Sequence, residues 1–197
     1  NKWSFRVKIG KGETFNGMRK ISLQHPATRN YIYEWVFHKM QEEMGLIAMR
    51  YNFVNFKIDV EGSQKDLGIF ALEEAFDKRM VENNERRSGV ILKFDEDALW
   101  QDRASASINK RVEKPFKDFY FNAPIVSFNK SKVKKDSVLL REFRNASALL
   151  DGYRKKQLPS LSVFDLDKMG RFMALVNLLG GEHAIIWHNV RFYYNLI

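Results

Sequence analysis

Alternation of apolar and polar residues restricts much of the first half of this chain to strands. Residues 3–9 carry an apolar side chain at every second position, and the second part of residues 51–60 repeats that pattern. A period of two indicates a strand with one buried face. Between these segments, apolar residues from 32 to 44 recur at helical spacing, and Gly45 follows as a stop signal. A helix with Thr28 as its N-cap is therefore predicted between the strands.

Further short strands are predicted at Met18–Leu23, Leu67–Leu72 and Val90–Phe94. The resulting order, β-β-α-β-β-(short helix)-β, gives an α+β class with a mainly antiparallel sheet. The glycine-rich stretch GKGETFNG, residues 10–17, matches neither the Walker pattern nor GxGxxG. It is therefore interpreted as a plain hairpin turn.

The second half has helical periodicity, from Ser137 to Asp151 and again from Leu166 to Leu179. A capping box beginning at Ser162 is predicted to start the second helix. Residues 97–137 mix charges, aromatic residues and prolines and are predicted to be an insertion with weak local structure. The predicted regions are a β-rich lobe (1–96), a basic insertion or linker (97–136) and a helical lobe with a terminal strand (137–197).

Composition excludes some functions and leaves others open. There is no cysteine, so disulfides and thiolate metal sites are excluded. No apolar run approaches the roughly 18 residues of a membrane span. The formal charge is +9, and residues 103–156 account for it, with 14 Lys/Arg against 5 Asp/Glu. Such a segment fits a docking surface for acidic protein, phosphate or nucleic acid, and it equally fits a solvated insertion.

A few polar residues stand out as candidates for chemistry. Glu73 and Glu74 end a predicted strand, so only one of them can point inward, although both could be solvated at a strand end. Lys93, in an otherwise apolar strand, either marks an exposed face or reaches a phosphate. His183 and His188 are five residues apart, which misses the i, i+4 spacing of a helical zinc pair.

The order of these residues along the chain suggests phosphoryl transfer. Basic residues occupy the early strands at Arg6, Lys8 and Lys20, a carboxylate follows at Glu74, and Lys93 lies on the next strand. A helical half then ends in a loop that contains histidine and asparagine. Phosphoryl transfer needs cations for the phosphates, a carboxylate that holds a lysine or a metal, and an acid/base near a metal ligand.

Seven segments resemble the CotH family, the spore-coat kinase-like proteins of bacteria. They occur in the family's order and span nearly the whole chain. The segments are FRVKI (Phe5–Ile9), MRKISLQHP (Met18–Pro26), RNYIYEWVFH (Arg29–His38) leading to Gly45-Leu46, GIFALEEAFDK (Gly68–Lys78), GVILK (Gly89–Lys93), VFDLDKMGRFMAL (Val163–Leu175) and WHNVRFYYN (Trp187–Asn195).

The resemblance implies an atypical protein-kinase-like fold that uses ATP and a divalent metal such as Mg²⁺ to phosphorylate Ser residues of partner proteins. By position, Glu74 matches the family's strand glutamate and Lys93 its strand lysine. Arg6 and Lys20 match basic positions on the early strands. Asn189 matches the asparagine after the catalytic loop, which a kinase uses as a metal ligand. A bacterial spore coat or cell envelope is the location that the resemblance suggests.

The chain departs from the family pattern in two places. Members usually carry an Asp five residues before that asparagine, where this chain has Ala184. Glu182 and His183 are the nearest polar candidates for the catalytic base, and imidazole can act as a base at neutral pH. The family also continues into a segment with a further metal-binding Asp, which is expected beyond Ile197, in a longer protein.

Two alternatives stay open. A kinase-like fold without catalysis could serve as a structural or assembly protein of a spore coat or envelope, and the replaced Asp favours this reading. A nucleic-acid-binding module could use Lys130, Lys132, Lys134 and Lys135. That module ranks third, because no aromatic stacking platforms are interleaved with those lysines in a recognised pattern.

Overall fold

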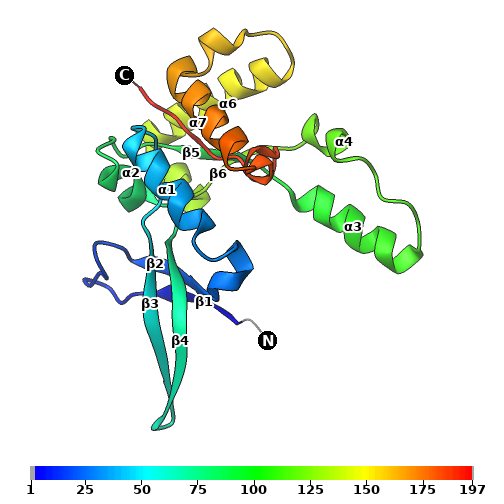
Figure 1. The fold of residues 1–197 in the computed structure, drawn as a ribbon. Helices are drawn as coiled ribbons and strands as arrows, with labels where there is room; N and C mark the ends of the chain where they lie inside the picture. Colours follow the sequence, from blue (N-terminus) through cyan, green and yellow to red (C-terminus); the bar gives the residue numbers. More distant parts are fainter. Residues whose placement is uncertain (1–2, 197) are drawn as a thin grey trace. The chain divides into compact units, whose positions relative to one another are not determined.

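A computed structural model describes residues 3–196 of the chain, which divide into two compact units. The first unit ends at Ser88 and the second begins at Gly89. Figure 1 labels most of the helices and strands.

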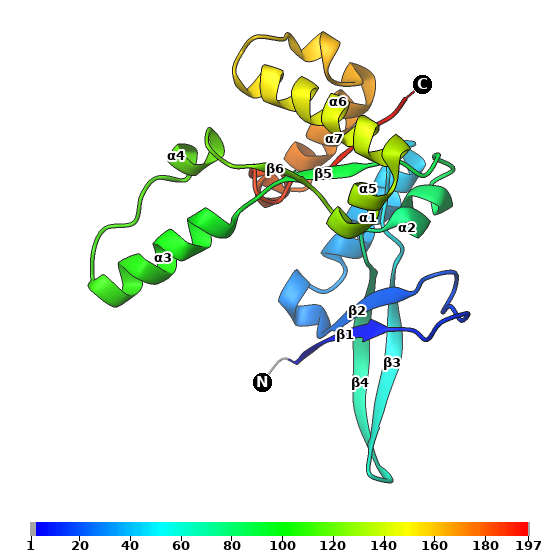
Figure 2. The same ribbon diagram turned by 180° about the vertical axis from the view of Figure 1, so that it is seen from behind.

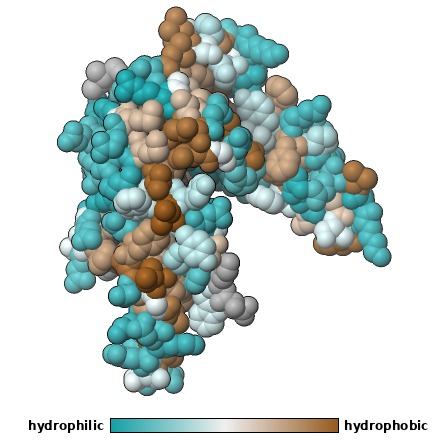
Figure 3. All heavy atoms as spheres, in the orientation of Figure 1, coloured by the Kyte–Doolittle hydropathy of each residue, from teal (hydrophilic) through white to brown (hydrophobic). Residues whose placement is uncertain are grey.

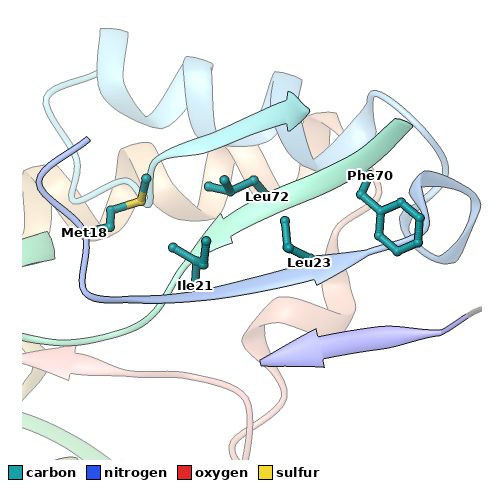
Figure 4. Packing of buried hydrophobic residues seen from close by; sticks show 5 residues of the cluster. All are labelled: Met18, Ile21, Leu23, Phe70 and Leu72. Atoms are coloured by element: carbon teal, nitrogen blue, oxygen red, sulfur yellow. The ribbon is translucent and has the colours of Figure 1, made fainter. Parts of the chain in front are cut away.

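The first unit is built on a four-stranded antiparallel sheet. Its strands are β1 (Ser4–Lys8), β2 (Lys20–Gln24), β3 (Tyr51–Val60) and β4 (Ser63–Glu74), in the order β1-β2-β4-β3. A 3-10 helix (Pro26–Arg29) and helix α1 (Tyr33–Glu43) follow β2, and helix α2 (Lys78–Asn83) follows β4. One face of the sheet is apolar, and Figure 4 shows its buried core: Met18, Ile21, Leu23, Phe70 and Leu72.

The predicted hairpin turn between the first two strands is confirmed. Phe15 and Met18 pair across a tight turn in which Asn16 and Gly17 have φ angles of 48° and 78°. At Gly17, a Cβ atom would lie 2.9 Å from Nη1 of Arg50. Glycine is therefore required there both by the left-handed backbone and by the close approach of that guanidinium.

The predicted N-cap of the first helix is wrong. Residues 26–29 form a separate 3-10 turn, in which the Thr28 hydroxyl donates to the carbonyl of His25. Asn30 and Tyr31 then adopt positive φ angles, so α1 begins only at Tyr33. The predicted stop at Gly45 is confirmed by its φ of 68°.

The second unit combines a small sheet with most of the helices. Its strands are β5 (Ile91–Phe94), β6 (Ile125–Ser127) and β7 (Phe192–Tyr193), in the antiparallel order β6-β5-β7. Its helices are α3 (Asp97–Asn109), α4 (Phe116–Tyr120), α5 (Lys130–Lys135), α6 (Ser137–Arg154) and α7 (Leu166–Leu178), with 3-10 turns at Ser160–Ser162 and Glu182–Ile185. The strand β5 and the residue before it pack against α5 and α6 through Val90, Leu92, Val133, Leu139 and Ala146.

Two predictions for this unit are corrected. Residues 97–137 are not weakly structured, because they form α3, α4, β6 and α5. Figures 1 and 2 show α3 and α4 extending away from β5 and from helices α6 and α7. The cap of α7 is Asp165 rather than Ser162, since its carboxylate accepts from the backbone N–H of Lys168 at 3.1 Å.

The predicted α+β class is confirmed by the antiparallel sheets and the several helices. Within residues 3–196, no helix has the length and apolar character that crossing a membrane requires.

Candidate functional site

The sheet of the first unit separates the predicted site residues onto two faces. Directly opposed residues of antiparallel strands share a face. Arg6 lies opposite Ser22, which lies opposite Glu73, and Lys20 belongs to the same face of β2 as Ser22. Glu74 lies opposite Ile21, on the core face. The structure therefore does not bring Glu74 together with Arg6 and Lys20. Its neighbour Glu73 shares their face instead.

Glu74 forms a buried ion pair with Arg50, the residue that precedes β3. Its carboxylate accepts from Nε of Arg50 at 2.9 Å, from Nη2, and from the Arg50 backbone N–H at 3.2 Å. Glu74 is only 2% exposed. Nη1 of the same guanidinium donates to the carbonyl of Asn16 at 2.6 Å. Glu74 thus holds an arginine, and through it the turn between β1 and β2, where a lysine or a metal was predicted.

Glu73 belongs to a second polar cluster, on the other face. Nε2 of Gln24 donates to its carboxylate at 2.7 Å, and Arg29 lies 3.3 Å from the carboxylate of Glu34. The Tyr51 hydroxyl lies near Glu34, but within residues 3–196 no hydrogen bond of normal geometry reaches that hydroxyl or Oε2 of Glu34. Burial raises the pKa of both carboxyl groups, and the charge of Glu34 raises the pKa of Glu73 further. Two partly desolvated carboxylates are therefore held close together here.

Replacing Glu73 by glutamine is expected to stabilise the first unit at neutral pH. Because the folded protein raises the pKa of Glu73 above its ordinary 4.5, folding favours the protonated form. The stability that this provides is present below pH 4.5 and is lost as the pH rises through the folded pKa. Glutamine mimics the protonated form, so Glu73→Gln should raise the free energy of unfolding by about 1 kcal/mol at pH 7.5 and change it little at pH 4.

Urea denaturation followed by circular dichroism at both pH values would measure this difference. Glu43→Gln on α1 is the matched control, since Glu43 is exposed and should show no such dependence. An equal effect of Glu73→Gln at both pH values would contradict the prediction.

In the second unit, Lys93 lies at one end of a chain of polar contacts. Its ammonium is 3.4 Å from the carboxylate of Glu96, which accepts from Nε1 of Trp100 at 2.9 Å. Lys93 also lines a shallow pocket of about 520 Å³, together with Ser127, Phe128, Asn129, Lys130 and Ser131. Lys130 is 3.5 Å from Asp95. Two ammonium groups therefore border one pocket, each already beside a carboxylate.

The loop before β7 brings Asn189 together with His183. Glu182 and His183 begin the 3-10 turn Glu182–Ile185, and both are exposed. Nδ2 of Asn189 donates to the carbonyl of His183 at 2.9 Å, which ties the turn to the chain that enters β7. The side-chain oxygen of Asn189 has the ligand chemistry that Mg²⁺ prefers.

His188 is the buried member of the same loop, at 5% exposure. Burial lowers its pKa, an effect that the carboxylate of Glu96 opposes. Burial also lowers the pKa of Arg191, and the charge of Glu96 opposes that effect. Nη1 of Arg191 donates to the carbonyl of His188 at 2.8 Å. Glu96 therefore connects the strand lysine Lys93 electrostatically with the loop.

A metal centre made by the protein alone is not found among residues 3–196, where His, Asp and Glu side chains form no group of three or more able to hold a metal ion. Mg²⁺ in phosphoryl-transfer sites commonly uses one or two protein ligands together with substrate phosphates and water. Asn189, whose hydrogen bond to His183 uses Nδ2 and not the amide oxygen, fits that second arrangement.

Sequence reasoning missed Arg50, Glu96 and Arg191. Arg50 has no spacing relation to Glu74 that a local pattern would reveal. Glu96 could have been found, because it lies three residues after Lys93 at the start of a helix. Arg191 directly precedes the aromatic run 192–194, and no local pattern relates it to Glu96.

A β-rich unit followed by a mainly helical unit, with a strand lysine, a carboxylate and a His/Asn loop, is typical of kinase-like proteins. The sequence model described as CotH kinase protein matches residues 1–195. The chain belongs to the CotH kinase family. A search of curated proteins found no match.

Proposed function

We propose that this protein is an ATP- and Mg²⁺-dependent kinase that phosphorylates Ser residues of partner proteins. Membership of the CotH kinase family suggests the use of a nucleotide and a metal. The observation that carries the proposal further is the contact of Lys93 with Glu96, because Glu96 also accepts from the indole of Trp100, which meets the ring of His188 in the His/Asn loop. A cation suited to phosphates and the candidate catalytic loop thus share one neighbourhood of one unit.

Each residue has a role that its surroundings support. Lys93 binds nucleotide phosphates as a point charge, and Lys130 borders the same pocket. Glu96 keeps the Lys93 side chain in place when the phosphates are absent. His183 is exposed, so it can accept the proton of an acceptor hydroxyl, with Glu182 as the neighbouring carboxylate. Asn189 offers an oxygen to a phosphate-bound Mg²⁺, whose charge would stabilise the transferring phosphoryl group.

The first unit contributes basic residues on its polar face. Arg6 and Lys20 are exposed there and remain candidates for binding nucleotide. Glu74 is proposed to act indirectly. It fixes Arg50, which holds the turn between β1 and β2.

Transfer of radiolabelled phosphate tests the function. The natural protein, with any sequence that flanks this chain in the cell, would be incubated with Mg²⁺ and γ-labelled ATP, and phosphoamino-acid analysis would identify the acceptor residue. Labelled phosphoserine that disappears on chelation of the metal is expected. Calorimetry would measure ATP affinity in parallel. If ATP shows no Mg²⁺-dependent binding, the kinase proposal is wrong and the non-catalytic alternative is favoured.

A further inference from the structure

The segment 97–121, here called the arm, contains α3, α4 and the connection between them. Ion pairs fold the connection back onto α3: Arg103 pairs with Glu113, and Arg111 lies 2.6 Å from Asp102. The same Asp102 carboxylate accepts from the backbone N–H of Lys114 at 3.2 Å. Figure 3 shows its surface as mostly hydrophilic, with apolar spheres toward its far end. The arm is therefore a structured element held by its own contacts.

The arm contacts the His/Asn loop through aromatic rings. Phe116 stacks on the imidazole of His188, with ring centres 5.5 Å apart and planes at 15°. Trp100 meets the same imidazole edge-on at 6.0 Å. The guanidinium of Arg103 lies over the Phe116 ring, with its central carbon 4.3 Å from the ring centre. Aromatic ring contacts in these geometries stabilise a structure beyond the burial of area alone.

Asn189 and Arg191 make hydrogen bonds through Nδ2 and Nη1, but several other side-chain nitrogens of the loop do not. Within residues 3–196, Nδ1 of His188, Nε1 of Trp187 and Nε of Arg191 are buried without a hydrogen-bonding partner. A buried polar atom without a partner is costly, and no hydrogen bond at that atom orients the side chain. Ring packing therefore holds the His188 imidazole: the arm supplies Phe116 and Trp100, and the neighbouring Trp187 meets the imidazole edge-on at 5.3 Å.

We propose that the arm positions the candidate catalytic loop and that Phe116 is a positioning residue of this protein. His188 lies directly before Asn189, and Asn189 is bonded to the carbonyl of His183. A shift of the imidazole therefore moves Asn189 and His183, the proposed metal ligand and the proposed base. Trp100 adds a second connection, since its indole also holds Glu96 beside Lys93. The effect of the arm on catalysis rests on the proposed kinase function, whereas its hold on the loop does not.

Hydrogen exchange tests the positioning without requiring activity. In Phe116→Ala, amides of residues 182–191 should exchange about 10-fold faster than in the wild-type protein, while peptides from β5 and α6 keep their rates. Phe116→Tyr retains the ring and should restore wild-type exchange. Phe121→Ala is the matched control, because Phe121 also belongs to the arm and is exposed like Phe116, but its ring packs on Tyr120 rather than on His188. Mass spectrometry of peptic peptides would measure all four proteins.

Kinetics then test the consequence for catalysis. Phe116→Ala is expected to lower kcat for phosphoryl transfer about 10-fold with little change in KM for ATP, because misplacement of reacting groups affects the chemical step. Unchanged exchange in residues 182–191, loss of protection throughout the second unit, or failure of Phe116→Tyr to restore the loop would each overturn the inference. A higher kcat in Phe116→Ala would also overturn it, since the arm would then obstruct the loop. If the wild-type protein transfers no phosphate, the kinase proposal fails while the exchange result still decides whether the arm holds the loop.

Discussion

Replacement of Arg50 by methionine is expected to lower the free energy of unfolding by about 3–5 kcal/mol, because it leaves a buried carboxylate without its cation. Glu74 is 2% exposed and receives three hydrogen bonds from Arg50, of which only the backbone bond would remain. The contact of the guanidinium with the carbonyl of Asn16 would also be lost. The turn between β1 and β2 should therefore loosen together with the ion pair.

Urea denaturation measures the stability, and hydrogen exchange of peptides from residues 3–88 assigns the loss to the first unit. The double variant Arg50→Met/Glu74→Leu removes both charges and should recover most of the stability. Lys57→Met is the matched control, because Lys57 and Asp66 form an exposed pair with side chains 63% and 58% accessible. Such pairs contribute about 0–1 kcal/mol. A loss below about 1 kcal/mol in Arg50→Met would show that the pair does not hold the unit together.

The double variant also tests the role of Glu74 in function. If Glu74 acts only by holding Arg50, the refolded double variant should bind ATP with an affinity close to that of the wild-type protein. If the carboxylate itself orients a phosphate-binding lysine or a metal, as its family position implies, binding will be lost although stability returns.

Replacement of Lys93 by methionine is expected to weaken ATP binding by about 10- to 100-fold, the equivalent of one charge-assisted contact with a phosphate. Transfer of phosphate should fall by about 100-fold or more, since a cation aimed at developing charge acts mainly in the transition state. Stability should change little, because the Lys93 and Glu96 side chains are partly accessible, at 26% and 22%.

Comparison of ligands separates a phosphate contact from a general effect. Affinity for ATP should fall in Lys93→Met, whereas affinity for adenosine should not. Lys134→Met on α5 is the control, because Lys134 is exposed and does not line the pocket. Equal losses for adenosine and ATP, or equal losses in the two variants, would contradict the assignment of Lys93 to the phosphates.

Local patterns in the sequence predicted much of the fold. The period of two in residues 51–60 located β3, and the helical spacing after Ser137 located α6, because burial of one face imposes a period on each element separately. Prediction was poorer where local backbone geometry competes with the periodic pattern of apolar residues. Residues 26–31 form a 3-10 turn followed by positive φ angles, which postpones the start of α1. The charged segment 97–137 has no clear period, because its helices bury few residues.

The site was predicted only in part. The sequence by itself determined family membership, the strand that carries Lys93 and the loop that carries His183 and Asn189, since these are properties of short segments. Only the tertiary structure decided which glutamate faces the basic residues, because a sheet face is fixed by the register of β2 against β4.

The same holds for the contact between Phe116 and His188. These residues lie on segments that are far apart in the sequence, and neither segment carries a signal for the other. Packing of the arm against the loop is a property of the folded second unit, in which ring contacts surround an imidazole whose Nδ1 has no hydrogen-bonding partner among residues 3–196. The sequence thus specified the candidate chemical groups, and the fold decided which of them are held together.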